Sequence, residues 1–300
     1  MATTTVTTGR APATRQPRLS RRRWWGEIGW RYVVAAVAIV YAVWPIVYII
    51  SASLAERGTL TGSNALFADV SSANYAKLGD TYFWTWLANT LVIASTTAVG
   101  TVLMGAAAAY AFSRFRFRGR RAGLIGLLII QMFPQLLAFV AIFLLLLVLG
   151  EVTPLLGLNS RVALIMVYLG GALGVNTFLM YGFFNTVPRE LDEAAKIDGA
   201  THAQTYWTII LRLVAPILAV VALLSFISSF SDFLLAKLVL QSESKWTLAV
   251  GLYQWVSDQL SANWGLFAAG ATIGAIPIVV IFLFLQRYIV SGLTAGSVKG

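Results

Sequence analysis

The sequence predicts an all-α membrane protein with six transmembrane helices. The first observation is composition: 58% of the residues are hydrophobic, 11% are charged, and the mean hydropathy is +0.77. These values favour one membrane-embedded body over the two soluble domains that 300 residues would otherwise suggest. The second is charge spacing, because a bilayer core about 30 Å thick needs about 20 residues of helix with few or no charges. Six long runs lack Asp, Glu, Lys and Arg: residues 32–55, 81–113, 122–150, 162–188, 213–231 and 259–286.

These runs are apolar on all sides, whereas strands of a membrane barrel alternate in polarity over about ten residues, so helices are expected. Six spans place both termini on one side of the membrane. If that side is the cytoplasm, the inner segments hold 17 of the 22 basic residues, including "RFRFRGRR" (114–121). This positive-inside bias predicts cytoplasmic N- and C-termini.

The same patterns divide the chain into segments. Residues 1–31 are expected to form a disordered basic cytoplasmic tail that leads into the first span, because the first 23 residues lack acids and are rich in Thr, Arg and Pro. A cleaved signal peptide is disfavoured, because the apolar run that follows is too long. Residues 32–290 are expected to form the six-helix domain, and residues 291–300 a C-terminal cytoplasmic tail.

Composition also disfavours several function classes. The net charge of +10 is mostly explained by topology, and a nucleic-acid-binding role is disfavoured because the basic residues are divided among separate loops. Cysteine is absent and His202 is the only histidine, so no metal site is expected. A membrane-embedded enzyme would need clustered His, Asp or Glu near one membrane face, and the spans carry none. A secondary transporter would need a coupling-ion site or an inverted repeat, and neither is visible.

Polar residues inside the spans are informative, because each must face protein or water. Gln131 and Gln135 are four residues apart beside Pro134, and Ser225 begins a stripe at intervals of three and four in the fifth span. Such a stripe fits either the wall of a solute pathway or hydrogen bonding between helices. The candidate pathway residues are Gln131, Gln135, the asparagine that follows Val175 (Asn176), Ser228, Ser229 and Asp232.

Residues 188–212, here called the charged segment, are unusually polar for this chain. Pro188 fits the first turn of a helix whose first turns are acidic, where the helix dipole favours negative charge. Gly199 suits a left-handed C-terminal cap, and Thr201 with Gln204 matches a capping box that would start a second helix running into Leu213. The segment is therefore predicted to be a helix, a sharp turn and a helix on the cytoplasmic side. Its small residues suit docking to another protein, although a solvated linker has the same composition.

The spacing within the charged segment resembles the EAA loop of permease subunits in bacterial ATP-binding-cassette importers. The matching residues are Glu193, Ala194, Ala195, Gly199, Ile209 and Leu211, in the inner loop before the penultimate span. That family usually places proline after the leucine, whereas this chain has Arg212, with Pro216 four residues later. We therefore expect a straighter lead into the fifth span without loss of docking.

The resemblance extends over roughly residues 30–300. The stretches "AYAFSRFRFRGRR", "QMFP", "WTLAVGLYQW", "WGLFAAGA" and above all "QRYIVSGLTAGSVKG" are similar to the smaller permease subunit of maltose-type (MalG-like) sugar importers. The resemblance implies a type I importer (MetI-like) fold in the bacterial inner membrane. It also implies transport of maltose, maltodextrin, trehalose or a related α-glucoside, with another sugar class as the alternative.

The resemblance further implies partners and contact sites. The chain would pair with a homologous larger (MalF-like) permease subunit and two cytoplasmic (MalK-like) ATPase subunits. An extracytoplasmic sugar-binding protein would deliver sugar to loops 56–80, 151–161 and 237–258. The chain lacks a G-x-x-x-x-G-K-[ST] signature, so ATP and Mg²⁺ are assigned to the partners, and no catalytic residue or cofactor is expected here. The implied ATPase contacts are Glu190, Glu193, Ala194, Ala195, Asp198, Gly199 and Ala200 in the charged segment and Gly292, Leu293, Thr294, Ala295 and Gly296 in the tail.

Overall fold

The computed structural model describes residues 25–55, 66–67, 69–257 and 263–295. The predictions for the N-terminal tail up to residue 24, for residues 56–65 of the first loop and for Gly296 lie outside the described residues. Two compact units, Met1–Tyr48 and Ile49–Gly300, are considered separately. The first contains the π-helical turn η1 (Trp25–Gly29) and most of α2 (Trp30–Ser53), which is long and apolar enough to cross a membrane.

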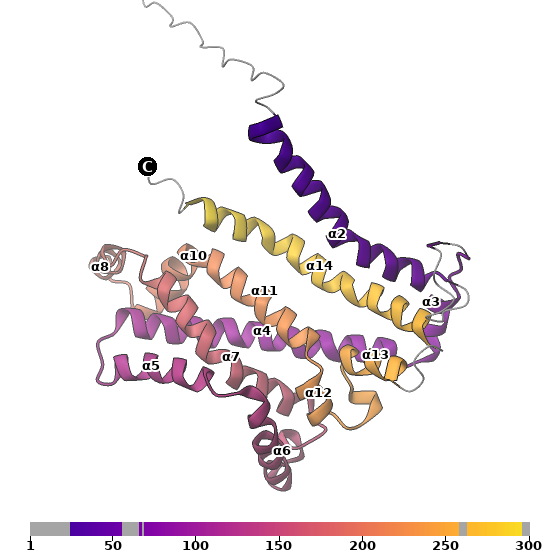
Figure 1. Cartoon of the computed structure of the whole chain (residues 1–300). Helices are drawn as coiled ribbons and strands as arrows, with labels where there is room; N and C mark the ends of the chain where they lie inside the picture. Colours follow the sequence, from indigo (N-terminus) through magenta and orange to yellow (C-terminus); the bar gives the residue numbers. More distant parts are fainter. Residues whose placement is uncertain (1–24, 56–65, 68, 258–262, 296–300) are drawn as a thin grey trace, which may run out of the picture. The chain divides into compact units, whose positions relative to one another are not determined.

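The second unit is built around one long helix, α4 (Phe83–Arg114). It packs along α7 (Arg161–Phe184) and α11 (Ala215–Ser231), and α11 in turn packs against α14 (Trp264–Ala295). Figure 1 shows α7 and α11 crossing α4 at an angle. Small residues allow this close approach: Ala106 and Ala109 are buried, and Gly105 lies against Met180 of α7.

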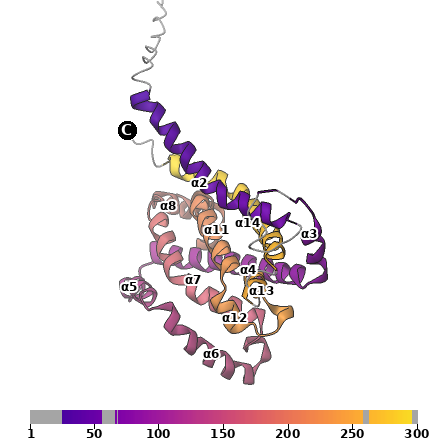
Figure 2. The same ribbon diagram turned by 45° about the vertical axis from the view of Figure 1, so that its right-hand side comes forward.

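The third predicted span is broken. Its residues form α5 (Arg120–Gln131) and α6 (Gln135–Val152), whose axes differ by 100°. The cause is Pro134, because its ring clashes with the carbonyl of the residue four positions earlier and it has no N–H to donate. Figures 1 and 2 show α6 turning away from α5 at this point.

The lead into the fifth span is also bent, by 79°, between residues 202–213 and α11. The expectation of a straighter lead at Arg212 is therefore wrong. Pro216 lies in the first turn of α11, where its missing N–H costs nothing, but a helix continuing back through Val214 would bring its ring against the carbonyl of Arg212. The chain breaks at Val214, with φ −93° and ψ 7°. A proline four residues later thus breaks the helix despite the arginine.

The all-α fold class is confirmed, with no strand among the described residues. Four helices there are long and apolar enough to cross a membrane, and six spans result if each bent pair counts as one. The described helix α14 continues to Ala295, so residues 291–295 of the expected tail are helical. The shorter elements are α3 (Ala73–Lys77), η2 (Leu78–Asp80), η3 (Pro154–Leu156), α12 (Leu234–Val239), η5 (Glu243–Lys245) and α13 (Leu248–Ser257).

The N-terminal end of α4 holds the loop between α12 and α13. Trp86 donates its indole N–H to the carbonyl of Glu243 at 2.8 Å, and the amide of Asn89 donates to the carbonyls of Ser244 (3.1 Å) and Trp246 (3.0 Å). Trp86 is 1% exposed, and a side chain at Gly251 of α13 would collide with its ring. This end of α4 is therefore held by hydrogen bonds to backbone carbonyls and by tight packing, and Arg161 of α7 donates to Asn89 Oδ1 at 3.0 Å.

Candidate functional site

The charged segment begins with α8 (Glu190–Ile197), which starts two residues after the predicted Pro188. Glu190, Asp192 and Glu193 lie in its first turn, as predicted, near the positive end of the helix dipole. The helix ends at Gly199, whose φ of +80° is left-handed. The N–H of Gly199 donates to the carbonyl of Lys196 at 3.0 Å and that of Ala200 to the carbonyl of Ala195 at 2.9 Å. This is the Schellman pattern, and it confirms the predicted glycine cap.

The second half of the charged segment starts with the predicted capping box. The N–H of Gln204 donates to Thr201 Oγ1 at 3.3 Å, and the N–H of Thr201 donates to Gln204 Oε1 at 2.8 Å. From there the chain continues as α9 (His202–Gln204), the π-helical η4 (Thr205–Ile210) and α10 (Leu211–Leu213). The helix, turn and helix predicted from the sequence are thus present.

The two faces of α8 differ in burial. Ala195 is 5% exposed and Asp192 is half-buried, so this face turns toward the rest of the unit. The opposite face is exposed and includes an isoleucine, Ile197, that is 87% exposed. Residues at intervals of three and four share a helix face. The exposed face of α8 therefore consists of Glu190, Glu193, Ala194 and Ile197.

The remaining predicted ATPase contacts are divided between these faces. Asp198 and Gly199 are exposed at the turn, and Ala200 is half-buried. Ala195 is buried, so it supports α8 from beneath instead of offering surface. In the tail, residues 292–295 continue the backbone of α14, while Gly296 lies outside the described residues.

The charged segment rests on the C-terminal end of α4. Tyr206, which is 8% exposed, packs against Tyr110 of α4 with ring centroids 4.9 Å apart. Ile210 and Val214 extend this buried cluster toward Phe184 of α7. Burial of these apolar side chains fixes the segment to α4 and α7.

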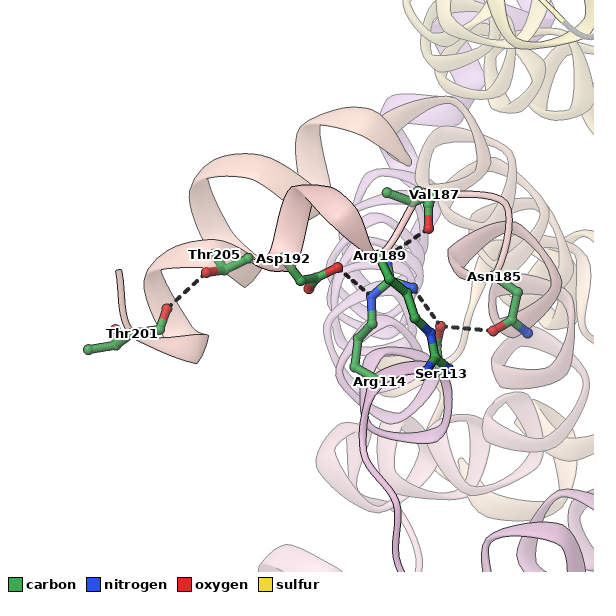
Figure 3. A network of polar contacts seen from close by, with 8 residues as sticks. All are labelled: Ser113, Arg114, Asn185, Val187, Arg189, Asp192, Thr201 and Thr205. Carbon is green, nitrogen blue, oxygen red and sulfur yellow. Dashed lines mark hydrogen bonds and ion pairs between the residues drawn. The ribbon is translucent and has the colours of Figure 1, made fainter. Parts of the chain in front are cut away.

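Polar contacts join the same elements, as Figure 3 shows. Arg114 Nε lies 2.9 Å from Asp192 Oδ2, and the exposed fractions of the two side chains are 6% and 14%. A second guanidinium nitrogen of Arg114 donates to the carbonyl of Val187 at 3.0 Å, and Arg189 donates to the carbonyl of Ser113 at 3.2 Å. The hydroxyl of Ser113 donates to Asn185 Oδ1 at 2.9 Å. We call these six residues the Arg114 network.

Sequence analysis missed Arg114. The residue was counted as one of the basic residues that set topology, and its four neighbours in "RFRFRGRR" are arginines of the same kind. One signal was present: Arg114 directly follows the charge-free run 81–113, so it lies at the end of the helix that the fold places beside the charged segment. Only the packing shows which arginine is buried.

Four of the six candidate pathway residues line one cavity of about 800 Å³: Gln131, Asn176, Ser228 and Ser229. Gln131 donates to the carbonyl of Gly171 at 2.9 Å, and Asn176 donates to the carbonyl of Ala172 of its own helix at 2.8 Å. The side chain of Gln135 lies outside the described set.

Asp232 is not in the cavity lining. It accepts a hydrogen bond from Tyr168, a lining residue, at 2.8 Å, and it accepts the N–H of Ala236 at 3.0 Å. This aspartate therefore caps α12 and holds a wall residue in place. Two lining hydroxyls, on Thr97 of α4 and Ser225 of α11, are buried without a hydrogen-bond partner within the described part of the chain.

Residues 101–295 match the family model described as "Binding-protein-dependent transport system inner membrane component". The chain is 42% identical over 275 residues to the maltodextrin transport system permease protein MdxG of Bacillus subtilis, covering 90% of this chain and 95% of that protein. It is 38% identical to the galactooligosaccharides transport system permease protein GanQ of the same organism, covering 90% and 94%. It is 44% identical to the maltose/maltodextrin transport system permease protein MalG of Escherichia coli, covering 72% of each chain.

Among solved structures, the fold is similar to a chain of a bacterial ABC transporter involved in the import of the acidic polysaccharide alginate. The TM-score is 0.73 at 26% identity, covering 91% of this chain and 99% of that one. A chain of the alginate transporter in complex with an alginate pentasaccharide-bound periplasmic protein has a TM-score of 0.63 at 17% identity, covering 88% and 96%, and supports the fold alone. The helical architecture, the family match and these relatives agree, and this chain belongs to the inner-membrane permease component family of binding-protein-dependent transport systems.

Proposed function

We propose that this chain forms half of the translocation pathway of an ATP-driven importer for a neutral oligosaccharide of the maltodextrin class, and that α8 couples it to cytoplasmic ATPase subunits. The observation that carries the coupling role is the exposed face of α8. Ile197 is 87% exposed at the end of a short helix whose other face is anchored to α4. An apolar side chain so exposed, among Glu190, Glu193 and small residues, suits a groove on a partner protein.

The partners follow from this assignment. A homologous permease subunit would complete the pathway, two ATPase subunits would bind the exposed faces of the two α8-type helices, and an extracytoplasmic binding protein would deliver the sugar. ATP hydrolysis belongs to the ATPase subunits, and both termini of this chain would lie in the cytoplasm. Movement of α8 would shift the pathway between inward and outward openings, to the extent that each ligand prefers one state.

The cavity supports a neutral sugar as substrate. Among the described residues, its lining contains no Asp, Glu, Lys, Arg or His, while amides and hydroxyls come from Gln131, Asn176, Ser225 and Ser228. Such groups hydrogen-bond sugar hydroxyls, whereas an acidic polysaccharide such as alginate would need positive charge to offset its carboxylates. The names of the relatives agree, since they mention maltodextrin, maltose and galactooligosaccharides.

The coupling role is tested with Glu193→Lys and Gly199→Asp in the complete transporter reconstituted in vesicles. The first reverses the charge at an acidic position of the exposed face, and the second strains a left-handed turn. Both variants are expected to insert normally and to lose sugar uptake that is driven by ATP and blocked by vanadate. Glu27→Lys, a glutamate of η1 outside the charged segment, is the matched control. Normal uptake in either test variant, with a full complement of ATPase subunits, would refute the role of α8.

The substrate is tested through the cognate binding protein. Calorimetric titration with maltose, maltotriose, trehalose and a galactooligosaccharide ranks the neutral sugars, and an oligomer of uronic acid serves as the charged comparison. We expect at least one glucoside to bind with a dissociation constant of about 1 μM or lower. A value of about 1 μM corresponds to a binding free energy of about −8 kcal/mol. Preference for the galactooligosaccharide would indicate another sugar class, the one named for the relative GanQ. Preference for the uronic acid oligomer would contradict the neutral-substrate proposal.

A pathway role for the serines predicts water access. The chain contains no cysteine, so Ser228→Cys and Ser229→Cys report on single positions. Each is expected to react with a water-soluble thiol reagent in at least one transport state. A cysteine at Val220, in the same helix outside the cavity lining, is the control. Inertness of both serine positions in every state would remove them from the pathway.

A further inference from the structure

We propose that Arg114 is the positioning residue that transmits the movement of α8 into α4, and through α4 into the cavity wall. This inference rests on the proposed coupling function of α8. The predicted ATPase contacts lie on α8 and the candidate pathway residues lie at the cavity, and neither set includes a residue that joins the two places. Arg114 supplies that connection.

The geometry of Arg114 supports this role. The three guanidinium nitrogens all have polar neighbours. Nη2 donates to the carbonyl of Val187 and Nη1 to Ser113 Oγ at 3.3 Å, while Nε lies 2.9 Å from Asp192 Oδ2 in a charge contact without hydrogen-bond alignment. The planar guanidinium holds its nitrogens in a fixed fork, so a single side chain contacts both the residue before Pro188 and the first turn of α8. At 6% exposure, solvent has little access to compete for these bonds.

Both partners of the ion pair occupy electrostatically favourable ends of helices. Arg114 is the last residue of α4 and Asp192 lies in the first turn of α8, so each charge opposes the partial charge of its own helix terminus. Arg189 adds a second bond in the opposite direction, because it belongs to the charged segment and donates to the carbonyl of Ser113 in α4. This carbonyl is one of the last four of α4, which have no partner within the helix. The two arginines thus fasten α8 to the end of α4 from both sides.

The other end of the connection is the cavity. The helix that ends at Arg114 also carries Thr97, which lines the cavity and whose hydroxyl is buried without a partner among the described residues. Seventeen residues of continuous helix separate Arg114 from Thr97, which at 1.5 Å per residue is about 26 Å. A helix is stiff over this length, so displacement at Arg114 reaches the cavity wall.

The experiment compares sugar transported per ATP hydrolysed in the reconstituted complete transporter. Arg114→Met and Asp192→Asn are expected to keep ATPase activity but to lower this ratio about fivefold or more, the lower bound of typical coupling energies. Asp192→Glu keeps the charge and is expected to retain most of the ratio. Arg116→Met is the matched control, because Arg116 is exposed two residues further along and no ion pair or hydrogen bond of its side chain is seen in the described structure.

A second measurement follows the connection directly. Spin labels on Lys196→Cys in α8 and Leu103→Cys in α4, both exposed positions, report the distance between the two helices. With Asp192 present, the distance distribution is expected to stay narrow when ATP is added. With Asp192→Asn it is expected to broaden, because α8 then moves without α4.

The outcomes separate the two proposals. Copurification of ATPase subunits with the unaltered chain tests the coupling function itself. If they copurify but the ratio is unchanged in both Arg114→Met and Asp192→Asn, the transmitting role of Arg114 is wrong and the docking role stands. Loss of the assembled complex in Asp192→Asn, which conserves side-chain size, would also overturn the inference, because the pair would then serve assembly.

Discussion

The two ends of α4 hold their neighbours by different chemistry. At the N-terminal end, Trp86 and Asn89 bind backbone carbonyls of the loop before α13, and Trp86 is 1% exposed. At the C-terminal end, an ion pair between Arg114 and Asp192 holds α8. Both ends also have buried apolar contacts, but the bonds of Trp86 and Asn89 to the loop go to backbone carbonyls, whereas the Arg114–Asp192 contact depends on two side-chain charges. The comparison separates an end of α4 held by hydrogen bonds to a loop from an end held by an ion pair to a helix that is exposed on its other face.

The largest effect is expected at the N-terminal end of α4. Trp86→Ala removes a fully buried indole and its hydrogen bond, and should lower the free energy of unfolding by about 3–5 kcal/mol. Denaturant or thermal unfolding in detergent measures this loss. Trp84→Ala, two residues away and 54% exposed, should cost less than about 1 kcal/mol. Similar losses for the two tryptophans would contradict the tight packing assigned to Trp86.

A side chain added at the same end of α4 should destabilise the protein less than the loss of Trp86. In Gly251→Ala the new methyl group would fall on the ring of Trp86, and the strain should lower the free energy of unfolding by about 1–3 kcal/mol. Gly126→Ala in α5 serves as the control, because nothing lies within 4 Å of a side chain there. The prediction fails if Gly251→Ala is as stable as Gly126→Ala.

At the C-terminal end of α4, Gly199→Ala in the turn after α8 should have a smaller and more local effect. A φ of +80° costs a residue with a Cβ about 1–2 kcal/mol. We expect faster hydrogen exchange of the amides at the C-terminal end of α8, with the unfolding of the whole protein little changed. Gly182→Ala, in the regular helix α7, should leave exchange in α8 unaffected. Global destabilisation by Gly199→Ala would contradict the local effect expected here.

The smallest effect is expected at the capping box. Thr201→Ala removes the hydroxyl that accepts the N–H of Gln204, and should cost about 1 kcal/mol of local stability. Hydrogen exchange of residues 202–204 reports this loss. Thr208→Ala removes a hydroxyl that bonds only within its own helix, to the carbonyl of Gln204, and should change exchange less. Equal effects of the two substitutions would refute the capping role of Thr201.

Local chemistry in the charged segment could be predicted from the sequence. Gly199 and the pair Thr201 and Gln204 satisfy backbone groups within a few residues of themselves, so their roles follow from spacing alone. The spans were also predictable, since the cost of burying charge in a bilayer acts on each run separately.

The bends and the network were not predictable in the same way. The sequence contains Pro134 and Pro216, but a proline inside an apolar run is compatible with either a kink or a full break, and packing decides between them. For the same reason, nothing in the sequence separates Arg114 from Arg116. The first is buried against Asp192 and the second is exposed, because α4 ends where the charged segment crosses it.

The break at Pro134 has a consequence for membrane thickness. With 12 residues, α5 is about 18 Å long, well short of a hydrocarbon core of about 30 Å. If α5 and α6 together form one span, Gln131 at the end of α5 lies at intermediate depth in the bilayer, far from either surface. A polar break at that depth persists only where protein or water covers it, and Gln131 opens onto the cavity. Hydration of this protein would then extend into the middle of the membrane along α5.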